Sequence, residues 1–244
     1  MYSLGSAESW SKRFQEISLL GLSLVPLMAI RSIMTPSEIE SQSLVVGFSF
    51  ITICLLGGIA GIRPSTCFVS FSSDSRQDDH EMSQEPLPRN ESARRGHHYP
   101  CEDFSTHILN IGERVFCAGC TGLSTGAALA ILGSWFYFII GVPLLYAELA
   151  FWTGFAGVVI GIIQHKIYRV LGNPGGAFHF LLNVIFVSGA FLLLAGTDQL
   201  AGSIAIDSYI LLIVLFWIYT RIVMSKSEHQ RICSRCGSQL CHNQ

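Results

Sequence analysis

Charged residues are scarce in this chain of 244 residues and make up 13% of its positions. Soluble domains carry about 25% charged residues, so this shortage excludes an ordinary soluble globular enzyme. Half of the residues are hydrophobic, and the mean hydropathy is +0.46. This composition is typical of a membrane protein with several transmembrane helices, whose first partner is the lipid bilayer.

The chain also lacks a large net charge of either sign and the common catalytic motifs. Its formal net charge is −2, so no broad basic field predicts a nucleic-acid partner. We find no serine nucleophile elbow, phosphate-binding glycine loop, H-E-x-x-H motif or pair of intramembrane carboxylates. The polar stretch 1–15 and the absence of a cleavage site after it predict no cleaved secretory signal.

Long apolar runs predict an all-α, polytopic bundle of about six transmembrane helices. A helix needs about 20 mostly apolar residues to cross the hydrocarbon core. Five ranges are strong candidates: Leu44–Ile62, Thr121–Gly141, Leu149–Ile163, Ala177–Gly196 and Ile204–Met224. A sixth, Ile17–Met34, is marginal because Pro26 lies inside it and Arg31 lies near its end. This segment either spans the bilayer or lies on its surface.

The basic residues predict how this bundle is oriented. With six spans, every Lys and Arg except Arg31 lies on or near the side that holds both termini and the long loop. The connections on the other side carry Glu38, Glu40, Glu148, Asp198 and Asp207. Because positive charge prefers the cytoplasmic side, we expect an integral cell-membrane protein with both termini and the long loop cytoplasmic. If the first segment does not span, the N-terminus moves outside and the loop stays inside.

The apolar runs divide the chain into five parts. Residues 1–62 hold the first two candidate spans, and residues 121–224 form a four-span bundle. Residues 63–96 are polar, Ser-rich and of mixed charge, which predicts a disordered cytoplasmic linker. Two segments rich in cysteine and histidine, 97–120 and 225–244, flank the four-span bundle.

The segment 97–120 has the composition of a zinc site. Its potential ligands are His97, His98, Cys101, His107, Cys117 and Cys120. Thiolate and imidazole are ligands that Zn²⁺ prefers, and four of them close a tetrahedral structural site. The C-x-x-C pair chelates one ion from a tight turn, and Cys101 with His98 completes the favoured set. The other two histidines remain alternatives.

The C-terminal segment 225–244 carries a second group of potential zinc ligands. They are His229, Cys233, Cys236, Cys241 and His242. Their spacing, with Gly237 after the second cysteine, is typical of a compact zinc knuckle. The two groups hold separate zinc ions, or their C-x-x-C pairs share one ion, so we expect one or two ions per chain.

The pair Cys117 and Cys120 also supports an enzymatic alternative. A cysteine in the first turn of a helix has a lowered thiol pKa, and a cytosolic C-x-x-C pair can exchange disulfides. A zinc site with an open coordination position would instead favour a hydrolase. The surplus of ligands favours a closed structural site, so the preferred interpretation is non-enzymatic: a scaffold, sensor or transporter.

A polar group near the ends of two predicted spans is a second candidate site. It comprises Gln164, His165, Arg169, His179 and Asn183. Ionisable residues at membrane depth are functional candidates by default. The alternative is structural, because Arg169 can anchor the helix at the membrane surface and His179 can hydrogen-bond a neighbouring helix.

The sequence around Cys101 and V-F-C-A-G-C-T-G resembles a family of predicted prokaryotic membrane proteins of unknown function. In that family a short cytoplasmic Cys/His segment ends in C-A-R-C-T-G and leads directly into a span. Here the motif runs from Cys117 to Gly122, with Gly119 in place of the arginine. Glu102 follows Cys101 where the family has His-Gln. The resemblance covers about half the chain, weakly through Gln164 and Asn173, and implies a prokaryotic membrane protein without assigning an activity.

Overall fold

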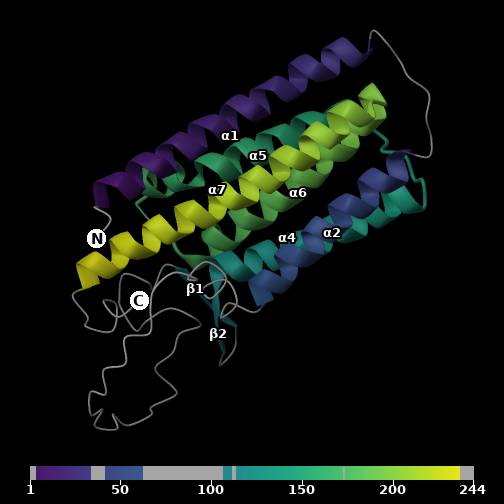
Figure 1. Cartoon of the computed structure of the whole chain (residues 1–244). Helices are drawn as coiled ribbons and strands as arrows, with labels where there is room; N and C mark the ends of the chain where they lie inside the picture. The colour runs from purple at the N-terminus through teal and green to yellow at the C-terminus, as the bar shows by residue number, and fades with distance from the viewer. Residues whose placement is uncertain (1–3, 34–41, 63–106, 112–113, 173, 237–244) are drawn as a thin grey trace, which may run out of the picture.

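The computed structural model describes residues 4–33, 42–62, 107–111, 114–172 and 174–236, and these residues form six long helices (Figure 1). In chain order the helices are α1 (Leu4–Ile33), α2 (Gln42–Ile62), α4 (Ala118–Ser134), α5 (Ala147–Val170), α6 (Gly176–Ala201) and α7 (Ile204–Cys236). A short π-helical turn, η3 (Trp135–Ile139), continues α4. A two-stranded hairpin precedes α4.

Successive helices run in opposite directions, so the bundle has two distinct ends (Figure 1). The hairpin, the beginning of α1 and the end of α7 lie at one of them, which we call the hairpin end. The turn from α6 to α7 lies at the other, which we call the turn end. At the turn end Gly202 adopts a positive φ of 55°, which lets the chain reverse between Ala201 and Ile204.

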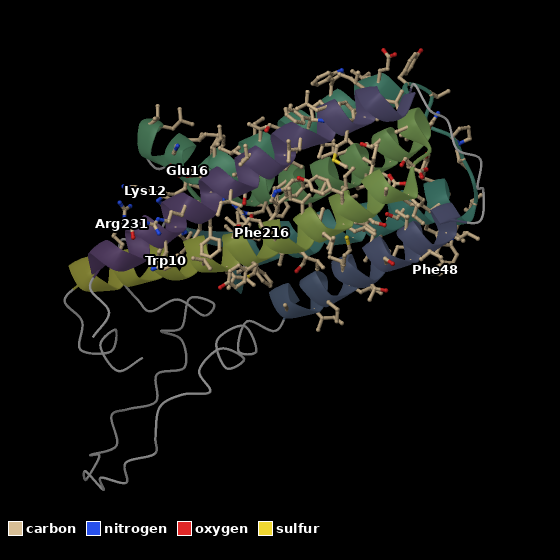
Figure 2. All side chains as sticks on the ribbon, turned by 45° about the horizontal axis from the view of Figure 1, so that its top comes forward. Trp10, Lys12, Glu16, Phe48, Phe216 and Arg231 are labelled. Carbon is tan, nitrogen blue, oxygen red and sulfur yellow. The ribbon has the colours of Figure 1, made fainter. Side chains whose placement is uncertain are left out.

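The prediction of six candidate spans is confirmed by length and composition within the described residues. Each of the six helices, with α4 counted together with its continuation η3, contains an apolar window of at least 18 residues that is long enough to cross a membrane. The marginal first segment meets this requirement because its apolar window is Ser9–Ile30, which begins earlier than predicted. Pro26 lies inside α1 without ending it. Large apolar side chains are exposed on the bundle, as a lipid environment favours; examples are Leu56 and Phe48, the latter labelled in Figure 2.

Helix α6 is the central helix of the bundle and packs closely against α4 and α5. A Cβ on Gly122 would lie 2.5 Å from the carbonyl oxygen of Phe180, and one on Gly157 would lie 3.1 Å from that of Ile185. Each of these glycines is followed by a second one four residues later, Gly126 and Gly161, and such spacing favours close approach of helix backbones in lipid. The corresponding pair in α2, Gly57 with Gly61, is used only in part, because a Cβ on Gly57 would meet nothing within 4 Å.

The hairpin was not predicted from the sequence. It consists of β1 (Ile108–Ile111) and β2 (Arg114–Cys117), paired antiparallel with Ile108 opposite Cys117. The backbone of Ile108 lies directly against Gly176, where any Cβ would collide with it. Since β2 leads straight into α4, the hairpin is held between the first turns of α4 and α6.

Helix α7 continues past the predicted end of the last span at Met224 and reaches Cys236. The backbones of His229, Cys233 and Cys236 are therefore helical, and their side chains lie outside the described part of the structure. The predicted ligands Cys241 and His242 also lie outside the described residues, as do the linker 63–96 and the predicted ligands His97, His98 and Cys101.

Candidate functional site

The hairpin brings His107 into contact with an intramembrane histidine. His107 directly precedes β1, and its imidazole ring lies 4.5 Å from that of His179, measured between ring centroids. His179 belongs to the first turn of α6, where its amide N–H donates to the carbonyl oxygen of Gly175. The contact follows from the packing of Ile108 on Gly176, because each histidine is close in sequence to one of these residues. A predicted zinc ligand and a predicted intramembrane residue therefore meet.

Tyr168, near the end of α5, completes a row of rings with these histidines. Its ring stacks on His179, with centroids 3.8 Å apart and the planes inclined by 29°. Tyr168 is 7% exposed, and its hydroxyl forms no hydrogen bond within the described residues. A buried hydroxyl without a partner costs free energy, so this atom marks a place where a polar ligand or water would be stabilised.

Further along α6 from His179, the side chain of Arg221 connects α5, α6 and α7. Nη1 of Arg221 donates a hydrogen bond to the carbonyl oxygen of Gly161 at 3.1 Å, and Nη2 donates to Oδ1 of Asn183. The guanidinium carbon lies 5.2 Å from the ring centroid of Phe186. Nδ2 of Asn183 donates to the carbonyl oxygen of His179 at 2.6 Å. These contacts satisfy a cation inside an apolar bundle with a carbonyl, an amide and an aromatic face.

A second polar contact crosses from α5 to the extension of α7. Nε2 of His165 lies 3.1 Å from Oε2 of Glu228, and Nη2 of Arg231 lies 2.6 Å from Oε1 of the same carboxylate. On the neighbouring helix α1, the buried Gln15 donates from Nε2 to the carbonyl oxygen of Ile162 at 2.9 Å. The carbonyl oxygen of the Gln164 side chain is buried without a hydrogen bond within the described residues.

The C-x-x-C pair lies beside this site, at the junction of β2 and α4. Cys117 is the last residue of β2, and Cys120 lies in the first turn of α4. Both are half-buried thiols. Cys117 and His107 are close enough to His179 for their charges to act on it. Within the described residues no group of three or more His, Cys, Asp or Glu is arranged to hold a metal ion.

The predicted intramembrane group is brought together in part. His179 and Asn183 lie one turn apart on α6 and share a hydrogen bond, and His165 lies within electrostatic range of His179. The side chain of Arg169 lies outside the described part of the structure. Arg221 was not predicted as a site residue, although its position inside the last apolar stretch is a usable signal of a functional cation.

At the turn end the structure corrects another expectation. The sequence predicted no pair of intramembrane carboxylates, but Asp198 of α6 and Asp207 of α7 lie within hydrogen-bonding distance of each other. The hydroxyl of Tyr137, in η3, donates to Oδ2 of Asp198 at 2.8 Å. The two aspartates precede and follow the turn that reverses the chain, so only the fold brings their side chains together.

Comparisons of the chain with protein-family models, with curated proteins and with solved structures give no match. The resemblance to the family with the C-A-R-C-T-G motif therefore stays a prediction.

Proposed function

We propose that this chain is a membrane sensor in which a cytoplasmic zinc site holds the hairpin against the polar site of α5, α6 and α7. In this proposal zinc occupancy fixes the position of His107, and His107 transmits that position to His179. The contact between these two rings, 4.5 Å apart, is the observation that carries the proposal. It connects the segment that supplies the zinc ligands to the residues that lie inside the bundle.

The hairpin geometry is compatible with the predicted first zinc site. Cys117 and Cys120 are three residues apart where a strand gives way to a helix, the C-x-x-C spacing of structural zinc sites. Ile108 is paired with Cys117, so the chain that enters β1 starts beside the first thiol. A chain spans at most about 3.5 Å per residue, so the nine residues from His98 to His107 are long enough, at up to about 32 Å, for a ligand at position 98 or 101 to reach the C-x-x-C pair.

Part of the second group of potential ligands lies on a helix that ends at the same end of the bundle. Cys233 and Cys236 occupy the last turn of α7, which ends at the hairpin end (Figure 1). With Cys241, His242 and His229 they form a second zinc site, or they share one ion with Cys117 and Cys120. The proposal therefore predicts one or two zinc ions per chain.

We place the hairpin end in the cytoplasm. Figure 2 shows Lys12 of α1 and Arg231 of α7 at this end. Glu148, at the start of α5, and Asp207, at the start of α7, lie near the other end. This asymmetry agrees with the preference of basic residues for the cytoplasmic side. Thiols in the cytoplasm stay reduced, which keeps the cysteines available to bind zinc.

Transport past the polar site has weaker support than sensing. Asn183 is 2% exposed and Tyr168 is 7% exposed, so side chains fill the space between α5 and α6 at this depth. Interhelical hydrogen bonds from Arg221 further close the bundle there. A transporter would need this region to open, whereas a sensor needs only a change in how His107 contacts His179.

Metal analysis of the purified full-length protein tests the proposal. We expect one or two zinc ions per chain by mass spectrometry, with Cys117 and Cys120 resistant to alkylation until a chelator is added. The double variant Cys117→Ser/Cys120→Ser is expected to lose one ion, or all bound zinc if the two groups share it. Cys54→Ala is the matched control, because Cys54 is buried in α2, outside both groups.

An enzymatic alternative has one observation in its favour. Cys117 directly precedes α4 and Cys120 lies in its first turn, the position that activates thiols in disulfide oxidoreductases. Protein without zinc, together with a reversible disulfide between these two cysteines, would exclude the zinc sensor and support the oxidoreductase. A zinc ion with three protein ligands and a water would support a hydrolase instead.

A further inference from the structure

One face of α1 is exposed along most of the length of the helix. The exposed residues are three or four positions apart, so they lie on one side of the helix. They are Trp10, Arg13, Ile17, Leu20, Leu24 and Leu27, and we call them the α1 stripe. The other side of α1 packs against the bundle through buried residues such as Leu22 and Val25. The α1 stripe therefore faces the surroundings of the protein, which for a membrane span are lipid.

At the hairpin end of the bundle, the α1 stripe carries a cation that lies over an aromatic ring. The guanidinium carbon of Arg13 lies 5.5 Å from the ring centroid of Trp10, which is 54% exposed. Both residues lie in the first turns of the apolar window Ser9–Ile30, where the helix enters the hydrocarbon core. The ring of Trp10 contacts Phe14, and Phe14 packs edge-on against Tyr219 of α7 at 5.3 Å. The bundle therefore holds an interfacial tryptophan and a cation together at the depth of lipid headgroups.

The charge at this end of α1 is positive. Lys12 and Arg13 are both exposed, and Figure 2 shows Lys12 with Trp10 at the hairpin end. Among the described side chains of α1, Glu16 carries the only negative charge. Arg13 forms no ion pair with a carboxylate within the described part of the chain. Its guanidinium thus has an aromatic partner and keeps its N–H donors for an anion outside the protein.

We propose that the α1 stripe binds an anionic phospholipid, with the phosphate at Arg13 and Lys12 and an acyl chain along the apolar part of the stripe. A guanidinium pairs with phosphate oxygens through parallel N–H···O bonds, which a lipid phosphate at this depth supplies. From Arg13 to Leu24 the helix rises about 16 Å. This rise is about half of the hydrocarbon thickness, so the apolar part of the stripe matches one leaflet. Helix α1 supplies no predicted zinc ligand, and lipid binding is therefore independent of the zinc sensor.

Native mass spectrometry of the full-length protein released from detergent tests this proposal. The probes are dioleoylphosphatidylglycerol, which is anionic, and dioleoylphosphatidylcholine, which has the same acyl chains and no net charge. We expect the wild type to bind the anionic lipid about fivefold more tightly or better, the gain that one basic residue near a charged surface provides. This preference should shrink as ionic strength rises. Arg13→Gln should lower the affinity for phosphatidylglycerol to that for phosphatidylcholine, whereas Arg13→Lys keeps the charge and should retain most of the preference.

Lys166→Gln is the matched control, because it removes one exposed positive charge near the end of α5, at the same end of the bundle and outside the α1 stripe. This variant should keep the lipid preference of the wild type. Equal binding of the two lipids by the wild type, or an equal loss of preference in Arg13→Gln and Lys166→Gln, would overturn the proposal. Efficient disulfide cross-linking between Leu20→Cys copies in lipid vesicles would assign the stripe to a second copy of the chain and would also overturn it.

Discussion

Arg221 donates a hydrogen bond to the side chain of Asn183, and this contact joins α7 to α6 inside the apolar bundle. The same guanidinium bonds the carbonyl oxygen of Gly161 on α5. Three helices therefore converge on one cation near the hairpin end. Because a buried charge is expensive to leave unsatisfied, the contact constrains how these helices can move and identifies the residues whose change should have the largest effects.

Replacement of Asn183 by leucine should destabilise the bundle. The change leaves Arg221 without its amide partner, and hydrogen bonds to charged groups contribute about 1.5–3 kcal/mol. We expect the free energy of unfolding in mixed detergent micelles to fall by about 2 kcal/mol. The double variant Asn183→Leu/Arg221→Met should recover part of this loss, because no charge then remains unsatisfied. Thr52→Ala, at an exposed hydroxyl bonded within its own helix, is the control and should cause little change.

Removal of the Tyr168 hydroxyl, unlike the loss of the Asn183 amide, should not destabilise the bundle. Its oxygen is buried without a hydrogen bond within the described residues, so Tyr168→Phe should leave stability unchanged or raise it slightly. Tyr168→Ala removes the ring stacked on His179 and should cost about 3 kcal/mol. Thermal unfolding of both variants in one detergent measures the difference. A clear loss of stability in the phenylalanine variant would instead indicate a ligand or water bound to the hydroxyl.

Displacement of the hairpin should change the reactivity of the C-x-x-C thiols. Any side chain at position 176 collides with the backbone of Ile108, so Gly176→Val should push β1 away from α6. We expect Cys117 and Cys120 to be alkylated faster in this variant than in the wild type. Mass spectrometry of the labelled peptides measures the two rates. Gly57→Val is the control, because a Cβ there meets nothing within 4 Å. Equal alkylation rates in the two variants would argue against a hairpin docked on α6.

The histidine variants should distinguish the ligand from the transmitting residue. His107 lies against His179, so in the proposed sensor it contacts the bundle and His98 closes the zinc site. His98→Ala should release zinc, and His107→Ala should retain it. His97→Ala is the neighbouring control and should also keep the ion. Zinc content of the three purified variants measures this, and loss of zinc in the His107 variant alone would make His107 the fourth ligand.

The candidate site was predicted from the sequence only in part. His179 and Asn183 were identified because a polar residue stands out within an apolar helix and the four-residue spacing puts both on one face. Tyr168 and Glu228 lacked such a signal, since one is an ordinary residue near the end of a span and the other follows the last span. Neither reveals its partner until α5, α6 and α7 are packed together.

The sequence by itself determined the membrane class, the six candidate spans and the clustering of cysteine and histidine, because hydropathy and short spacings are local properties. Only the tertiary structure decided which residues meet. The pairs His107 with His179, Arg221 with Asn183, and Asp198 with Asp207 each join different elements of the fold. The hairpin likewise depends on tertiary packing, because two four-residue strands gain too little from local pairing to stand without α4 and α6.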